Sequence, residues 1–287
     1  MNKTEFTRPI VELITSRSSW RSYKSQPLEP ELRSQIIDYI NRQTQGPLGH
    51  TTRFQLIEKD DPLRIDNASF GTYGFIKNAR NFIAGAVEKG TRHWEDYGYN
   101  LEKIILRMTD LGLGTCWLGG TFKRSEFGPL LNVGIKEVIP AITPVGYGTT
   151  NRAVRDRVIR WGAKSRTRRP WKVLFFDGSF SLPLSVFVAG KFVQVLEMVR
   201  LAPSASNRQP WRIVRDGSAF HFFLQRTPNY SGFTKSTDLQ RVDMGIAMCH
   251  FDLTAREAGF TGEWIDAEPN IDLPELAEYI ISWKTIG

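Results

Sequence analysis

The most distinctive segment of this 287-residue chain reads Ala202-Pro203-Ser204-Ala205-Ser206-Asn207-Arg208-Gln209-Pro210-Trp211. It follows a predicted helix over residues 192–201 and leads into a predicted strand. By composition alone, a polar turn closed by Pro210 is the better interpretation. The segment is nevertheless unusually rich in side chains that can bind the polar edge of a planar heterocycle, namely Ser204, Ser206, Asn207 and Gln209.

The sequence on both sides of this segment predicts an alternation of helices and short strands. In the helix over residues 192–201, Val195, Leu196 and Val199 recur with helical spacing. Strands are predicted over residues 211–214 and 220–224. A longer helix over residues 244–258 then ends at Gly259, and its inward face is expected to carry Met244, Ala247, Met248, Phe251 and Ala255.

The first half of the chain has the same order of elements. A helix over residues 32–40, with Pro30 at its start, precedes strands over residues 54–57 and 82–87. A long helix over residues 99–111 follows and ends at a glycine turn. In both halves the glycine after the long helix precedes a tryptophan by the same distance, Gly112 to Trp117 and Gly259 to Trp264.

This repeated order predicts an internal duplication of one α+β unit. We expect a first half over residues 1–165 and a second half over residues 166–287, each with a mainly antiparallel sheet flanked by helices. Two related halves commonly pack about a pseudo-two-fold axis, as the subunits of an isologous dimer do. The chain would then act as a monomer that mimics a dimer, with a ligand cleft between its halves.

The composition indicates an ordinary globular protein, with 41% hydrophobic and 24% charged residues. The most apolar stretch, residues 180–190, contains Pro183 and is too short to cross a bilayer. Residues 1–14 lack the apolar core of a secretory signal, so we expect a soluble, cytoplasmic protein with no membrane partner. The two cysteines and four scattered histidines show no metal-ligand spacing, and no metal site is predicted.

A strongly basic segment joins the two halves. Residues 152–172 are rich in Arg and Lys and contain a single acidic residue, Asp156. Such a segment is typical of a site for an anionic partner, such as a phosphate, an anionic lipid or a nucleic acid, or of a solvated connector. Trp161 and Trp171 are its only aromatic residues, too few for a typical nucleic-acid surface, so no nucleic-acid partner is expected.

Three further segments carry groups suited to a ligand. The first, Arg17-Ser18-Ser19-Trp20-Arg21-Ser22-Tyr23-Lys24, follows an N-terminal helix and offers guanidiniums and hydroxyls to a phosphate. The second, Gly112-Leu113-Gly114-Thr115-Cys116-Trp117-Leu118-Gly119-Gly120-Thr121-Phe122, has glycines that let the backbone approach a ligand closely. The third, Lys164-Ser165-Arg166, lies in the basic segment. Taken singly, each also fits a solvated turn or a helix end.

Together, these segments resemble the signature segments of the FMN-dependent nitroreductase superfamily, and the resemblance covers most of the chain. The most specific part is the pattern Pro-Ser-x-x-Asn-x-Gln-Pro-Trp at Pro203 to Trp211. Most members of that family are homodimers with two flavins at the interface, each held by both subunits. The resemblance therefore implies a nitroreductase-like fold and an FMN site between the halves.

Transferred residue by residue, the resemblance implies a role for each motif. Arg17, Ser19 and Arg21 would bind the phosphate and the polar edge of the ring, Lys164 and Arg166 would form a second basic pair near the phosphate, and Ser204 and Asn207 would reach in from the other half. Gly119 and Gly120 match the turn whose backbone N–H faces flavin N5. The complete predicted cofactor site comprises Arg17, Ser18, Ser19, Arg21, Thr72, Leu118, Gly119, Gly120, Lys164, Arg166, Pro203, Ser204, Ala205 and Asn207.

The sequence departs from the usual family order in a way that predicts one FMN per chain. The loop of the first half, residues 46–53, lacks the Pro-Ser-x-x-Asn pattern, and the second half has no Arg-Ser-x-Arg segment near residues 177–192. One composite site therefore retains both motifs and the other has neither. This complementary loss resembles the branch of the superfamily whose members are fused pseudo-dimers.

The function implied by the resemblance is an FMN-dependent NAD(P)H oxidoreductase. NAD(P)H would bind transiently and give hydride to flavin N5, and a small aromatic or quinone-type acceptor would then take its place in a ping-pong reaction. No catalytic side chain is required. A lasting dinucleotide site is not expected, because no Gly-x-Gly-x-x-Gly turn follows a strand. The alternative is a flavin-binding protein or a specialised flavin-using enzyme without general NAD(P)H reductase activity.

Overall fold

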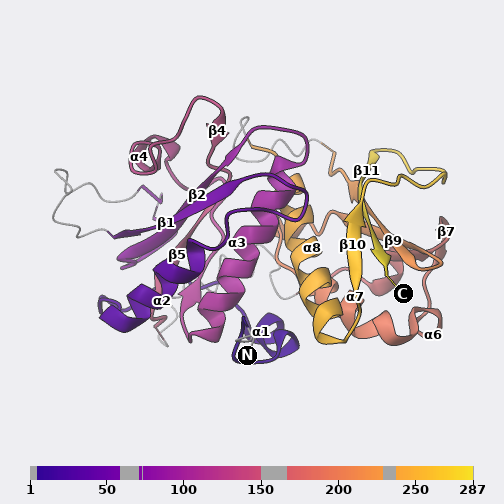
Figure 1. Ribbon diagram of the computed structural model, residues 1–287, viewed down its shortest axis with the longest axis horizontal. Helices are drawn as coiled ribbons and strands as arrows, with labels where there is room; N and C mark the ends of the chain where they lie inside the picture. Colours follow the sequence, from indigo (N-terminus) through magenta and orange to yellow (C-terminus); the bar gives the residue numbers. More distant parts are fainter. Residues whose placement is uncertain (1–4, 59–70, 73, 150–166, 229–236, 287) are drawn as a thin grey trace.

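Two β-sheets lie on either side of a central pair of long helices, α3 (His93–Asp110) and α8 (Leu239–Glu257) (Figure 1). The computed structural model describes residues 5–58, 71–72, 74–149, 167–228 and 237–286. The arrangement is α+β, with two mainly antiparallel sheets flanked by helices, as the sequence predicts. Among the described residues, no helix is both long enough and apolar enough to span a membrane.

The first sheet is formed by residues of the first half and is antiparallel at each of its pairings. Its order is β1-β2-β5-β3, with β4 pairing to β2. The strands are β1 (Thr52–Glu58), β2 (Asn81–Glu88), β3 (Gly114–Thr115), β4 (Glu137–Val138) and β5 (Ile142–Gly146). The predicted strands at 54–57 and 82–87 lie within β1 and β2 and are confirmed.

The second sheet is formed by residues of the second half, in the order β10-β11-β9-β8-β6-β7. Its pairings are antiparallel except for the parallel pair β6 and β8. The predicted strands at 211–214 and 220–224 lie within β8 and β9. The strands are β6 (Phe175–Asp177), β7 (Ser179–Pro183), β8 (Trp211–Asp216), β9 (Ala219–Gln225), β10 (Gly262–Ile265) and β11 (Ala277–Thr285).

The long helices end where the sequence predicts and begin earlier. Gly112 and Gly259, with φ of 74° and 82°, provide the left-handed residue that follows α3 and α8. α3 starts at His93, earlier than the predicted start at Tyr99. The prediction missed its first turn because Glu95 and Asp96 are buried there although they are charged residues, so the apolar periodicity does not extend to them. α8 starts at Leu239, where the Asp238 side chain caps the Arg241 N–H.

The remaining helices flank the sheets. The predicted helix at 32–40 corresponds to α2 with Pro30 in its first turn, and that at 192–201 corresponds to α7. The other helical elements are α1 (Ile10–Ser16), α2 (Pro30–Ile40), α4 (Arg124–Phe127), η1 (Trp171–Val173), α6 (Val186–Ala189), η2 (Gly190–Phe192), α7 (Val193–Arg200) and η3 (Ala205–Asn207).

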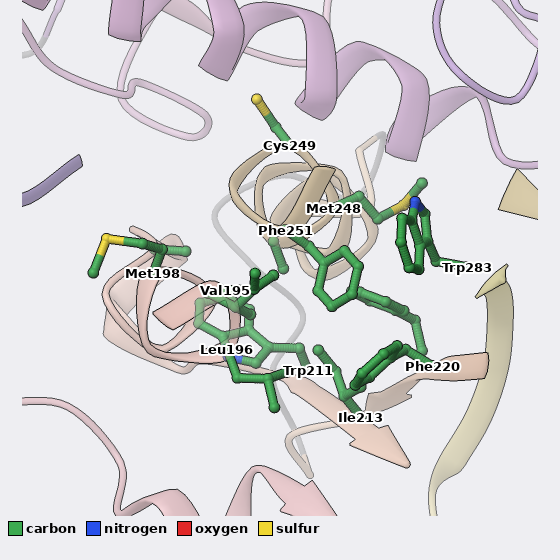
Figure 2. Close-up of a cluster of buried hydrophobic side chains, with 14 of the residues drawn as sticks. Val195, Leu196, Met198, Trp211, Ile213, Phe220, Met248, Cys249, Phe251 and Trp283 are labelled. Atoms are coloured by element: carbon green, nitrogen blue, oxygen red, sulfur yellow. The ribbon is translucent and has the colours of Figure 1, made fainter. Parts of the chain in front are cut away.

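The largest hydrophobic core lies between α7, α8 and the second sheet (Figure 2). The five side chains expected on the inward face of α8 are fully buried, which confirms that face. Ile10, Leu13 and Ile14 of α1 belong to the same core, although α1 precedes the first half's other elements in sequence. The N-terminal helix therefore crosses to the second half, and the residues that follow it start at the boundary between the two sheets.

The central helices cross at very short range. A Cβ atom added at Gly98 of α3 would lie 2.2 Å from the carbonyl oxygen of Val242, and one added at Gly245 of α8 would lie 2.0 Å from that of Glu95. Both positions therefore require glycine for the backbones to approach this closely. This crossing fixes how the two halves sit against each other and so shapes any cleft between them.

Candidate functional site

A cavity of about 260 Å³ lies where the two halves meet. Segments from both halves form its walls, as the sequence analysis expects of a ligand cleft between related units. Its lining residues include an arginine-rich segment, a glycine turn, a polar loop and one face of α8. They are Arg17, Ser19, Arg21, Phe75, Cys116, Trp117, Leu118, Gly119, Gly120, Thr121, Ala141, Arg168, Pro203, Ser204, Ala205, Ser206, Asn207, Leu239, Val242, Asp243 and Ile246.

The arginine segment enters the cavity as extended chain directly after α1. Trp20 N–H donates to the Thr115 carbonyl at 2.8 Å, and Ser19 forms a bridge with Thr115 beside the first sheet. In extended backbone, alternate residues share a face, so Arg17, Ser19 and Arg21 line the cavity together. Ser18, which lies between them, does not line it.

Trp20 anchors this segment from behind. A Cβ atom added at Gly148 would lie 2.3 Å from the Trp20 ring, and one added at Gly114 would lie 2.8 Å from it. These two glycines provide the space in which the indole packs. The ring therefore holds the extended segment against the sheet while its arginines face the other way.

The polar loop, residues 202–211, is held in shape by Asp243 of α8. Both Asp243 carboxyl oxygens lie within hydrogen-bond distance of the Ala205 N–H, at 2.9 and 3.1 Å. Ser204 Oγ accepts the Gln209 N–H at 2.9 Å. Ser206 and Asn207 have φ of 50° and 54°, a left-handed turn that asparagine tolerates better than most residues. The Pro-Ser-x-x-Asn pattern thus specifies a tight backbone turn at the edge of the cavity.

The glycine turn is fixed by Arg124. Its Nη2 donates to the Gly119 carbonyl at 2.7 Å and to the Pro140 carbonyl at 2.9 Å. The same nitrogen reaches Thr237 Oγ1 of the second half at 3.1 Å. On the other side, a Cβ at Gly119 would lie 2.5 Å from a terminal methyl of Leu239, so the Gly119 backbone packs closely against α8 at this point. The orientation of the Gly119 peptide is therefore set from both halves.

The cavity combines a cationic wall with a buried carboxyl, that of Asp243, whose pKa is raised. Burial, followed by the nearby charges of Arg17 and Arg200, lowers the pKa of Arg168 to about 10. On α8, burial raises the pKa of Asp243 well above its ordinary value, and the Asp238 charge adds to this effect. The hydrogen bond from Ala205 acts in the opposite direction. The cationic wall is thus suited to an anion, while the α8 wall is largely apolar.

The cavity brings together most of the residues that the sequence analysis selects, from three motifs distant in sequence. Ser18 and Thr72 do not line it, although Thr72 accepts the Phe75 N–H at 2.9 Å and Phe75 does line it. Lys164 and Arg166 lie outside the described residues. The predicted residues that line the cavity are Arg17, Ser19, Arg21, Leu118, Gly119, Gly120, Pro203, Ser204, Ala205 and Asn207.

Sequence reasoning missed Arg168, Asp243, Trp117 and Phe75 as cavity residues. Arg168 lies in the basic segment, two residues beyond the predicted Arg166, and its charge was the available signal. Asp243 gave a weaker signal as an acidic residue at the start of an otherwise apolar helical run. Among the described residues, no group of three or more His, Cys, Asp or Glu is suited to hold a metal ion.

Comparison with known proteins gives one family match that spans most of the chain. The family model described as "Putative TM nitroreductase" matches residues 9–255. Among solved structures, a putative nitroreductase from Thermotoga maritima is similar at 22% identity over 97% of this chain and 94% of that chain, with a TM-score of 0.60. The two proteins share a fold over nearly their whole lengths.

Smaller nitroreductase structures are similar over about half of the chain. A nitroreductase with bound FMN from Desulfitobacterium hafniense has 16% identity over 51% of this chain and 92% of that chain, with a TM-score of 0.40. One with bound FMN from Bacteroides fragilis has 18% identity over 52% and 92%, with a TM-score of 0.39. Comparison with curated protein sequences gave no match.

Proposed function

We propose that this chain, which belongs to the family described as "Putative TM nitroreductase", is an FMN-dependent NAD(P)H oxidoreductase that binds one FMN in the cavity between its halves. When bound, FMN would supply hydride transfer through N5, from NAD(P)H to a small aromatic or quinone-type acceptor. The chain's own residues would bind and orient the reactants, and no side chain is assigned a catalytic role.

The observation that carries this proposal is that partly buried arginines from the two halves, Arg17 and Arg168, line the same cavity. Arg17 and Arg168 approach closely enough for the charge of Arg17 to lower the pKa of Arg168, after the larger effect of burial. The Arg17 Nε atom is buried and makes no hydrogen bond within the protein. A phosphate dianion would offset the mutual repulsion and supply acceptors for such donors.

The other walls fit a flavin ring. Leu239, Val242 and Ile246 give α8 an apolar face in the cavity, and Trp117 and Phe75 add aromatic surface. The rigid Gly119 turn and the polar loop at Ser204 supply backbone and hydroxyl groups for the polar edge of a heterocycle. The residues that we propose as FMN contacts are the lining residues predicted from the sequence together with Arg168, while Ser18, Thr72, Lys164 and Arg166 remain predictions.

Matched features of the two central helices support the proposed duplication into residues 1–165 and 166–287. Asp96 of α3 accepts the Leu48 N–H at 2.7 Å and the His50 N–H at 2.9 Å, much as Asp243 of α8 holds the loop at Ala205. In each helix the aspartate lies two residues before the glycine of the crossing, Gly98 or Gly245. We propose that the first-half loop has kept its anchor and lost its ligand-binding pattern, which leaves one cofactor site and a monomer that acts as a pseudo-dimer.

The decisive test is the flavin content and the anaerobic spectrum of the purified chain. One FMN per chain, bleached by NADH or NADPH and recovered on adding a quinone, is the expected result. Two FMN per chain would contradict the single-site proposal, and no FMN would overturn the function. Bound FMN that neither nucleotide reduces would favour the alternative, a flavin-binding protein or specialised flavin-using enzyme.

A charge reversal tests where the cofactor binds. Arg21→Glu places a carboxylate in the cationic wall and should abolish FMN retention. The matched control is Arg80→Glu, which makes the same charge change outside the cavity, at a residue that donates to the Ser25 carbonyl. Equal flavin content in both variants would exclude the assigned site. We also propose a cytoplasmic location, because Cys116 and Cys249 are buried and form no disulfide, which suits a reducing compartment.

A further inference from the structure

We infer that Glu102 of α3 is a positioning residue that holds Arg17 and Trp117 in the walls of the cavity, and that His250 of α8 locks Glu102 in place from the other half. The inference rests on the proposed function, because it concerns the same cofactor cavity. Glu102 does not itself line that cavity, and its side chain is fully buried behind it. It therefore acts through its neighbours rather than by touching a ligand.

The first contact of Glu102 fixes an aromatic wall. Trp117 Nε1 donates to Glu102 Oε2 at 2.6 Å. Trp117 also packs against both of the main hydrophobic cores, on the two sides of the central helices. The hydrogen bond thus selects one orientation for an indole that would otherwise be held only by apolar contacts, which have no directional preference.

The second contact orients a cation. Arg17 Nε lies 3.8 Å from Glu102 Oε1, and the Arg17 side chain is 7% exposed. At this distance the two groups attract without a hydrogen bond, which agrees with the unsatisfied Nε. Contact at Nε is compatible with a bidentate contact between the terminal guanidinium nitrogens and an anionic ligand. Glu102 therefore keeps the Arg17 side chain in the wall of the cavity between the halves and orients its terminal nitrogens toward a ligand.

The third contact ties Glu102 to the second half. His250 Nε2 lies 2.9 Å from Glu102 Oε1, and His250 Nδ1 lies 2.8 Å from the Met198 carbonyl oxygen. Because a carbonyl can only accept, Nδ1 carries a hydrogen, and a further hydrogen must lie between Nε2 and Oε1. Both groups are fully buried, so this bond is shielded from competing water. Met198 of α7, His250 of α8 and Glu102 of α3 thus form one continuous chain of contacts behind the cavity.

The geometry of Glu102 can be checked without any ligand. A carboxylate that accepts at 2.6 Å should shift the Trp117 indole proton downfield in the NMR spectrum of the full chain. Glu102→Gln should move that signal upfield, and Trp117→Phe identifies it. The matched control is Glu95→Gln, another fully buried carboxylate of α3, two turns earlier, whose ion pair is with Arg241. The inference fails if the two Gln variants leave the signal equally unchanged.

A double-mutant cycle on FMN affinity then separates positioning from a general structural effect. We expect Glu102→Gln to weaken FMN binding about tenfold and Glu95→Gln to leave it unchanged. Added to Arg17→Ala, Glu102→Gln should cost only about a further threefold, because in that background only its contact with Trp117 remains to be lost. Equal losses in the two backgrounds, or wild-type affinity in Glu102→Gln, would overturn the inference while leaving the proposed function intact. A wild-type chain that does not bind FMN at all would overturn the proposed function, and the inference with it.

Discussion

Gly98 of α3 and Gly245 of α8 occupy reciprocal positions, each against the backbone of the opposite helix. Gly245 faces the Glu95 carbonyl and the Tyr99 N–H, and Gly98 faces the Val242 carbonyl. Such a reciprocal contact is what an isologous interface produces, here within one chain. The crossing also sets the distance between the arginine segment, which packs on the first sheet, and the polar loop, which is anchored to α8.

Substitution at this crossing should destabilise the protein and disrupt the cavity. In Gly98→Ala or Gly245→Ala, the added methyl would meet a backbone atom at 2.2 or 2.0 Å, so the helices must separate. We expect a loss of about 2–4 kcal/mol in the free energy of unfolding, measured by denaturant titration, as for other overpacked sites. Gly128→Ala is the control, because its methyl would lie 3.4 Å from the Arg124 carbonyl. A crossing variant as stable as the control would contradict this account.

Arg168 should contribute to cofactor affinity although the sequence analysis did not select it. Arg168→Ala removes one of two mutually repelling cations from the cavity, and should weaken FMN binding by about 10- to 100-fold. Arg169→Ala is the matched control, since Arg169 is the next residue, is exposed and lies outside the cavity lining. Flavin fluorescence titration measures both constants. A larger loss in Arg169→Ala would mean that the cationic wall is misplaced.

The parts of the fold that follow local rules could be predicted from the sequence. Apolar spacing identified the long helices, and the left-handed glycines Gly112 and Gly259 identified their ends. β5 was not predicted, because its sequence contains Pro144 and is buried at each position, so it shows neither alternation nor continuous strand propensity. β11, which closes the second sheet, was also missed, since its pairing with β9 and β10 is a property of the tertiary structure.

The residues of the candidate site also divide into those that local sequence rules predict and those that only the tertiary structure brings in. Arg17, Ser19 and Arg21 belong to one motif, and their common face follows from the alternation of extended backbone. Asp243 and Arg168 join the site only because α8 and the C-terminal part of the basic segment meet the polar loop in space. The role of Glu102 was harder still to predict. A glutamate in the middle of a helix usually faces solvent, and nothing in its local sequence indicates that it is buried.

Glu95 should make the stability of the protein depend on pH. Burial raises its pKa from 4.5 to about 7, and the charge of Arg241 opposes this only in part. Between these two values the unfolded chain releases a proton that the folded chain retains, so the free energy of unfolding falls as pH rises, by up to about 3 kcal/mol. Glu95→Gln should remove this decline in denaturant titrations between pH 4.5 and 7. Retention of the full decline in the variant would assign it to another group.

Asp243 gives the most direct connection between protonation and the shape of the cavity. Because burial raises its pKa well above 3.8, the folded state favours the neutral carboxyl. Asp243→Asn resembles that neutral form and keeps an oxygen to accept the Ala205 N–H. Above pH 3.8, ionisation of Asp243 stabilises the unfolded wild-type chain but not the folded one, so the wild type loses stability as pH rises. The melting temperature of Asp243→Asn should therefore rise relative to that of the wild type as pH increases.

Asp243→Leu separates the hydrogen bond from the charge. Leucine is neutral at every pH, so this variant should also lack the wild type's loss of stability with rising pH. Leucine cannot accept a hydrogen bond, however, so the Ala205 N–H is left without its acceptor. We expect it to be about 1–3 kcal/mol less stable than Asp243→Asn and to bind FMN more weakly, because the polar loop is released from α8. Melting curves from pH 4 to 9 and FMN titrations at one pH compare the two variants. If Asn and Leu behave alike, Asp243 does not anchor the loop, and the turn at Ser206 must be held by its own backbone geometry.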